Sequence, residues 1–149
     1  MREAYGQALA RRNGLACNVG MRSAVAAYLV VESVAIVAWW AFILAIPSWQ
    51  RHFLALDAPR STLLAFLAAD LVLVVLGFLV AALLASRRAG AWPLLCARAG
   101  AAVYASLYAI LLPIVGDGGM LGAAMMVPVL IVSPCAAALL RPRPATAVA

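Results

Sequence analysis

The stretch that decides the fold is residues 63–85, LLAFLAADLVLVVLGFLVAALLA, in which one charged residue, Asp70, interrupts an otherwise apolar run. At a rise of about 1.5 Å per residue, a helix of this length crosses the hydrocarbon core of a bilayer, which is about 30 Å thick. The polar residues Ser86, Arg87 and Arg88 end the run. The stretch therefore predicts a transmembrane helix.

Three further apolar runs accompany it, at residues 24–46, 91–112 and 119–140. The 149-residue chain is 68% hydrophobic and 11% charged, whereas soluble domains are about 45–50% apolar and about 25% charged. A chain this apolar cannot cover its core with polar surface, so the bilayer must serve as its solvent. Short links make neighbouring helices antiparallel. We therefore predict an all-α fold, an integral membrane four-helix transmembrane bundle running up-down-up-down.

The distribution of arginine predicts the orientation of this bundle. Every basic residue is Arg: four lie in residues 1–23, two in 86–90 and two in 141–149, against two in loop 47–60 and none in turn 113–119. Positive residues gather on the cytoplasmic side of transmembrane helices. We therefore expect both termini to be cytoplasmic, in a multi-pass protein of the cell (inner) membrane. The lysine-free, alanine-rich composition favours a GC-rich bacterial source.

The predicted organisation has three parts. Residues 1–23 form a basic cytoplasmic arm, residues 24–140 form the four-span transmembrane domain, and residues 141–149 form a disordered tail. Glycines at positions 6, 14 and 20 weaken helix formation in the arm, where a short amphipathic helix over residues 2–12 remains possible. The arginines flank the spans and form no basic patch on a soluble face, so we expect the lipid bilayer and no nucleic acid as partner.

Two of the spans carry buried charges at nearly the same predicted depth. Glu32 lies about 4–5 Å and Arg98 about 6 Å to the cytoplasmic side of the midplane, as counted from the helical rise. A charge at this depth costs about 2.5–3.5 kcal/mol on insertion scales, so it usually has a partner or a function. We expect an intramembrane ion pair between Glu32 and Arg98. Two alternatives stay open: Arg98 snorkels to the headgroups beside a neutral Glu32, or both line a wet site.

Asp70 has no basic residue at its own depth, about 6 Å to the outer side of the midplane. Tyr104 and Tyr108 are four residues apart, so they share one face of the third span. Tyr104 is close to Asp70 in depth, and we expect a hydrogen bond between them. Arg51 and Arg60 in the outer loop are alternative partners for Asp70. Asp70, Tyr104 and Tyr108 therefore form a candidate proton or ligand site.

A second candidate stripe lies on the first span. Tyr28, Glu32, Ala35 and Trp39 follow a 4-3-4 spacing that places them on one helix face. Such a face lines a site for a small cation or organic molecule, or it packs against a neighbouring helix. We weigh the packing interpretation more heavily.

Small residues and tryptophans complete the sequence features. Ala97, Ala101 and Ala105 form a small-xxx-small stripe that permits close helix approach, more often inside the bundle than at an interface with a second chain. Four tryptophans fit the aromatic belts at the membrane surfaces: Trp39, Trp40, Trp49 and Trp92.

No catalytic, nucleotide-binding or metal-binding motif occurs in the chain, so we expect no catalytic residues, no cofactor and no metal. The favoured function is an accessory or assembly subunit, or a membrane module that works with a membrane protein partner or as a homo-oligomer. The alternative is a small oligomeric proton-coupled transporter that uses Glu32 or Asp70, because intramembrane ionisable residues are functional by default. An enzymatic function is less favoured than either.

Overall fold

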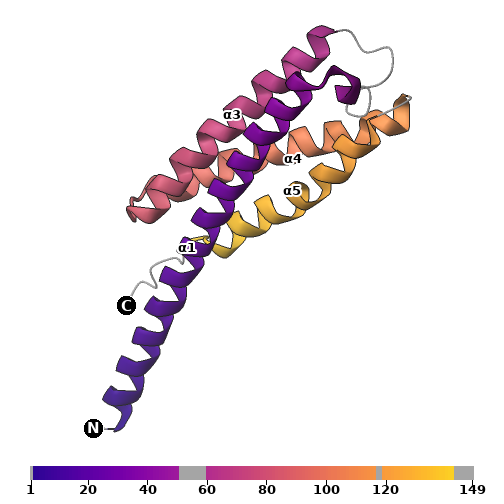
Figure 1. Cartoon of the computed structure of the whole chain (residues 1–149). Helices are drawn as coiled ribbons and strands as arrows, with labels where there is room; N and C mark the ends of the chain where they lie inside the picture. Colours follow the sequence, from indigo (N-terminus) through magenta and orange to yellow (C-terminus); the bar gives the residue numbers. More distant parts are fainter. Residues whose placement is uncertain (1, 51–59, 117–118, 143–149) are drawn as a thin grey trace.

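The computed structural model describes residues 2–50, 60–116 and 119–142, with side chains placed from residue 19 onward except for Arg60. Its elements are α1 (Arg2–Ala45), the short 3-10 helix η1 (Pro47–Trp49), α3 (Arg60–Ala85), α4 (Ala91–Val115) and α5 (Met120–Leu139). Figure 1 shows these helices in chain order. The described part of the chain contains helices and no strand, so the predicted all-α class is confirmed.

Four helices are long and apolar enough to cross a membrane. The candidate spans are Val19–Ala45, Ser61–Ala85, Ala91–Val115 and Met120–Leu139. The predicted four-span membrane architecture is therefore confirmed, with boundaries that differ from the predicted ones by a few residues. The predicted tail falls mostly outside the described residues, as do most of loop 47–60 and part of turn 113–119.

The N-terminal arm differs from the expected short helix, because α1 continues without a break from Arg2 to Ala45 over 44 residues. Figure 1 shows its N-terminal part projecting beyond the other helices. Each glycine in a helix costs about 1 kcal/mol relative to alanine. Since elongating an existing helix avoids a new nucleation step, the arm extends the helix that the first span has already formed.

The end of α4 also differs from the sequence expectation, which ended the third span before Pro113. The helix continues through Pro113 to Val115. An interior proline removes one N–H donor and crowds the preceding turn, but the helix continues past it, and the Gly116 N–H closes the last turn by donating to the Leu112 carbonyl at 2.9 Å. In α5, both Pro128 and Pro134 lie inside one helix.

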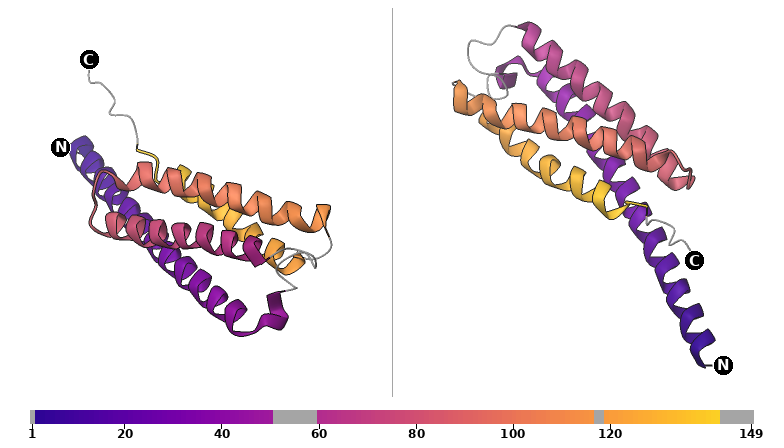
Figure 2. Two further views of the ribbon diagram at one scale, coloured as in Figure 1. Left: turned by 90° about the horizontal axis from the view of Figure 1, so that it is seen from above. Right: turned by 180° about the vertical axis from the view of Figure 1, so that it is seen from behind.

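The helices associate mainly as two pairs, α1 with α3 and α4 with α5, and α3 joins the pairs by packing on α4. In both views of Figure 2, α3 and α4 lie side by side while α1 crosses them at an angle. One apolar core draws on all four helices: Val25, Leu29, Val80, Ala81, Leu84, Ala91, Leu95 and Ala136. A smaller core, Trp40, Ile43 and Leu63, comes from α1 and α3 alone.

These two cores explain where the bundle is closed and where it is open. The four-helix core joins the early part of the first span to the late part of α3 and the start of α4. At the opposite end, the buried apolar residues come only from the α1–α3 pair. The space between α3 and α4 is therefore less completely filled toward the start of α3, and this is where a groove lies.

Candidate functional site: a buried ion pair and a groove at Asp70

The two buried charges of opposite sign meet in the centre of the bundle. Arg98 Nη2 on α4 donates a hydrogen bond to Glu32 Oε2 on α1, and the two atoms are 2.8 Å apart. The side chains are only 1% and 8% exposed, respectively. The backbones of α1 and α4 do not pack closely on each other, so the long arginine side chain spans the interior to reach the carboxylate. The structure thus brings together Glu32 and Arg98, which the sequence placed at a similar depth in the membrane.

Gly77 on α3 makes room for this contact. A Cβ at this position would overlap Ser33 Oγ on α1, and it would lie 3.4 Å from Arg98 Nε and 3.5 Å from the Leu29 carbonyl oxygen. Glycine is therefore the residue that lets α1 approach α3 while the guanidinium of Arg98 passes beside it. The sequence signal was a single glycine inside the apolar run of α3, and we had assigned it no role.

Three further polar side chains surround the ion pair, and together with Glu32 and Arg98 we call them the polar centre. Ser33 and Ser133 are buried, and the half-buried Tyr28 faces Glu32, Arg98 and Ser133. Within the described residues, Arg98 Nε, Arg98 Nη1 and both serine hydroxyls have no hydrogen-bond partner. Helices α1, α4 and α5 supply the polar centre, and α3 supplies the gap at Gly77.

The polar centre neutralises its own charges, because one buried carboxylate faces one buried guanidinium. A buried ion pair of this kind contributes little net stability, since desolvation offsets the attraction, but removing one partner is costly. Its specific effect is geometric, because the two side chains meet only when α1 and α4 have one relative position along their axes. We therefore interpret the Glu32–Arg98 contact as a device that sets helix register.

Asp70 has a different partner from the one expected. Its Oδ2 accepts a hydrogen bond from Trp40 Nε1 on α1 at 2.7 Å. Among the described residues, no hydrogen bond joins Asp70 to Tyr104, whose side chain is 75% exposed. The expected Asp70–Tyr104 bond is therefore wrong, because the indole N–H approaches the carboxylate from the α1 side. Arg51 and Arg60 have no described side chains.

Trp40 was itself assigned to the aromatic belts with Trp39, Trp49 and Trp92, but its side chain is buried inside the bundle. It is 3% exposed and packs in the smaller core with Ile43 and Leu63. The sequence signal was available, since Trp40 lies eight residues beyond Glu32 and hence closer in depth to Asp70. Adjacent tryptophans point to different sides of a helix, and only one of Trp39 and Trp40 turns fully toward α3.

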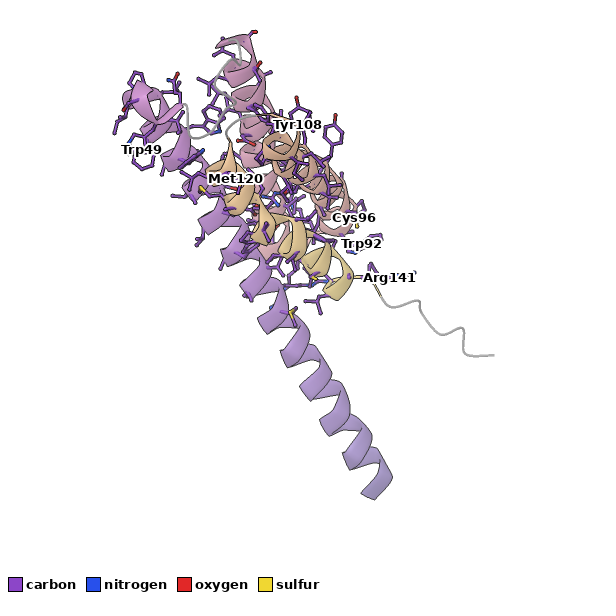
Figure 3. The ribbon with its side chains drawn as sticks, turned by 90° about the vertical axis from the view of Figure 1, so that its right-hand side faces the viewer. Trp49, Trp92, Cys96, Tyr108, Met120 and Arg141 are labelled. Atoms are coloured by element: carbon purple, nitrogen blue, oxygen red, sulfur yellow. The ribbon has the colours of Figure 1, made fainter. Side chains whose placement is uncertain are left out.

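Asp70 and the two tyrosines do share one feature, an open groove of about 330 Å³ between α3 and α4. Most of its wall is apolar, and two of its lining rings, those of Phe66 and Tyr108, contact each other with their centroids 5.4 Å apart. The lining residues are Thr62, Ala65, Phe66, Ala69, Asp70, Tyr104, Ala105, Tyr108, Ala109 and Met126. In Figure 3, Tyr108 lies toward the Met120 end of α4, away from Trp92, Cys96 and Arg141.

The stripe on the first span does not form one site. Tyr28 and Glu32 belong to the polar centre, whereas Ala35 is exposed. Trp39 is half-buried, packs beside the smaller core, and its ring centroid lies 6.3 Å from that of Phe42. The structure therefore separates Trp39 from the residues with which spacing grouped it.

The alanine stripe of α4 faces outward, contrary to the expectation that it packs inside the bundle. Ala97 and Ala101 are exposed, and Ala105 is partly buried at the groove. Gly100 beside them is also exposed, and a Cβ there would meet nothing within 4 Å. Five alanine and serine side chains on the other faces of α4 fill the interior instead, together with Leu95 and Arg98: Ala91, Ala99, Ala102, Ser106 and Ala109.

Compared with known protein families, curated proteins and solved structures, the chain matches none of them. Within the described residues, no three His, Cys, Asp or Glu side chains are grouped so that they could hold a metal ion. The polar centre, the groove at Asp70 and the outward small-residue face of α4 are therefore the features from which function is inferred.

Proposed function

We propose that this small membrane protein is a non-catalytic accessory or assembly subunit that binds a transmembrane helix of a partner membrane protein. The observation that carries the proposal is the outward face of α4, where Ala97, Gly100 and Ala101 are all exposed. Small residues allow helix backbones to approach closely, which is how transmembrane helices associate without a hydrophobic driving force. The bundle itself leaves this surface uncovered.

The internal use of the strongest charges supports the same proposal. Arg98 and Glu32 are paired inside the bundle, so neither is free to bind a substrate ion unless the pair breaks. Removing one partner of a buried pair costs about 3–5 kcal/mol. A structural role leaves the pair intact, whereas a transport role would have to supply this free energy each time the pair opened. We therefore favour the structural role.

The alternative function, a small proton-coupled transporter, would use Glu32 or Asp70. It is favoured by one observation, the groove that reaches Asp70. Glu32 does not line this groove, and Asp70 and Glu32 have different partners, Trp40 and Arg98. A polar cavity that reached both carboxylates would favour transport, whereas this groove reaches Asp70 and not Glu32, so we favour the subunit function.

The proposed setting is the inner membrane of a bacterium, with both termini in the cytoplasm and the helices in up-down-up-down order. The support is the excess of arginine in residues 1–23, 86–90 and 141–149 over loop 47–60 and turn 113–119. In this orientation Ala97 and Ala101 lie in the cytoplasmic half of the membrane. A helix of a different protein and a helix of a second copy of this chain both fit this surface, and the experiment below separates these two.

The test places a photoreactive amino acid at Ala97 of the full-length protein in its native host. The matched control position is Val75 on α3, which is 64% exposed but has bulky neighbours. We expect one discrete protein adduct from position 97, identified by mass spectrometry as another protein or as a second copy, and only lipid adducts from position 75. The added substitution Ala101→Trp should abolish the adduct by preventing close approach. Lipid adducts alone at position 97, or an adduct indifferent to Ala101→Trp, would refute the proposal.

A further inference from the structure

We propose that the groove between α3 and α4 binds a small organic cation with an apolar body, for which the Asp70 carboxylate is the countercharge. The groove begins beside the small-residue face on which the proposed partner helix would pack, because Ala105 continues the stripe of Ala97 and Ala101 and also lines the groove. Its volume, about 330 Å³, falls at the small end of the range of ligand pockets, about 300–1,000 Å³. Mostly apolar walls with a few fixed polar groups are typical of such pockets.

The carboxylate is fixed in position at the base of the groove. Asp70 is 4% exposed and lines the groove. On its α1 side, Trp40 Nε1 donates to Oδ2 at 2.7 Å. No donor to Oδ1 is found among the described residues, so this oxygen has lone pairs available to a ligand. A rigid indole partner on Oδ2, and an Oδ1 that accepts from no donor among the described residues, make a preorganised acceptor.

The walls suit the apolar part of a cationic ligand. Alanines at positions 65, 69, 105 and 109 keep the groove wide enough to admit a ring or a short alkyl group. The Phe66 and Tyr108 rings lie on its sides, and Tyr104, which is 75% exposed, stands at its edge. Aromatic faces attract cations by about 0.5–2 kcal/mol, with the larger values in desolvated sites. The groove thus offers apolar contact, aromatic faces and one carboxylate.

Charge is what favours a cation over a neutral lipid chain as the occupant. An acidic residue at this depth is costly and normally pairs with an opposite charge. Arg98, the buried arginine of the described residues, already pairs with Glu32. The partner of Asp70 that the structure describes, Trp40, is neutral. A bound cation would supply a countercharge that no described residue gives to Asp70, whereas an acyl chain would leave the carboxylate with only the Trp40 hydrogen bond that the structure describes.

The test uses benzyltrimethylammonium, a permanent cation whose charge does not vary with pH, and its neutral isostere neopentylbenzene. Equilibrium dialysis would measure binding of the radiolabelled cation to the purified full-length protein in lipid nanodiscs. Empty nanodiscs correct for partition into lipid. We expect saturable binding of the cation, with the neutral isostere competing at least about tenfold more weakly, because it cannot pair with the carboxylate.

Two sets of variants assign the binding to the proposed groups. Asp70→Asn retains an oxygen that can accept from Trp40, so the fold is kept, and the affinity should fall about tenfold or more. Tyr104→Leu should weaken binding several-fold by removing an aromatic face, whereas Tyr104→Phe should leave it near wild type. Since Tyr104 is largely exposed, these two variants test the site even if Asp70→Asn does not fold.

Three results would overturn the proposal. The first is absence of saturable binding to the wild-type protein. The second is equal competition by neopentylbenzene, which would identify the groove as an apolar slot for lipid. The third is unchanged affinity in folded Asp70→Asn, or equal affinities of Tyr104→Leu and Tyr104→Phe. None of these results bears on the partner-helix test at Ala97, so the two proposals fail separately.

Discussion

Gly77 on α3 and Ser33 on α1 lie in such close contact that a Cβ on the glycine would overlap the serine hydroxyl. This contact is next to the path of Arg98 Nε, which would be 3.4 Å from the same Cβ. A close approach of α1 to α3 and the route by which Arg98 reaches Glu32 therefore both depend on one position. The missing side chain of Gly77 lets α1, α3 and the Arg98 side chain of α4 fit together.

The first prediction concerns this glycine. Gly77→Ala should lower the free energy of unfolding by about 1–3 kcal/mol, because added volume in a packed interior forces neighbours to move. Thermal unfolding of the full-length protein in mixed micelles, followed by far-ultraviolet circular dichroism, would measure the change.

Ser33→Ala supplies the control for the glycine variant. The Ser33 hydroxyl is buried without a partner among the described residues, so this substitution alone should be neutral or slightly stabilising. With Oγ removed, the next atom near the added Cβ is 3.4 Å away. Gly77→Ala should therefore cost less in the Ser33→Ala background. If Gly77→Ala lowers the free energy of unfolding equally in both backgrounds, the added Cβ does not clash with the Ser33 hydroxyl.

The second prediction concerns the ion pair. Arg98→Met or Glu32→Gln alone should destabilise the bundle by about 3–5 kcal/mol, because each leaves a buried group without its partner. The double variant should be more stable than the sum of the two losses indicates, with a coupling of about 0.5–3 kcal/mol. A double-mutant cycle of unfolding free energies measures this coupling, and additive losses would contradict a direct Glu32–Arg98 interaction.

The third prediction concerns the indole partner of Asp70. Trp40→Phe keeps an aromatic ring in the smaller core but removes the N–H that donates to Asp70 Oδ2. Leaving a buried acceptor unsatisfied costs about 1–3 kcal/mol, and more when it is charged. Trp40→Phe should therefore lower the free energy of unfolding less in an Asp70→Leu background than in the wild-type protein. If Trp40→Phe costs the same in both, the hydrogen bond is not the source of the effect.

The fourth prediction concerns orientation in the membrane. Arginine counts place Ser86 on the cytoplasmic side and Gly116 on the outer side, and both are exposed. In a background lacking the three native cysteines, a membrane-impermeant maleimide added to intact cells should label Gly116→Cys and spare Ser86→Cys. Permeabilised cells provide the control in which both react. The opposite labelling in intact cells would reverse the predicted topology.

The predictable part of the site was the part governed by depth. Glu32 and Arg98 were paired by counting helical rise from the span midpoints, and the structure brings their side chains to 2.8 Å. Rise along a helix is nearly constant, so depth follows from position. Rotation about the axis and the tilt between helices are not constant. That is why depth alone assigned Tyr104 to Asp70, when Trp40 makes the hydrogen bond.

Position along the chain also could not show which faces stay uncovered. Ala97 and Ala101 were expected inside the bundle and are exposed, because Arg98 and its buried neighbours on the other side of α4 turn inward. The rotation of α4 about its own axis is set by the Glu32–Arg98 contact and by the packing of small residues around it. Both depend on residues distant in sequence.

By itself, the amino-acid sequence determined that four apolar helices cross a bilayer, because length and hydropathy are summed along each segment and need no partner. It also showed where charges interrupt those segments. Only the tertiary structure decided that Gly77 admits Arg98 to Glu32, that Trp40 holds Asp70, and that a groove remains between α3 and α4. These features depend on how helices rotate and cross, and side-chain packing between segments sets those angles.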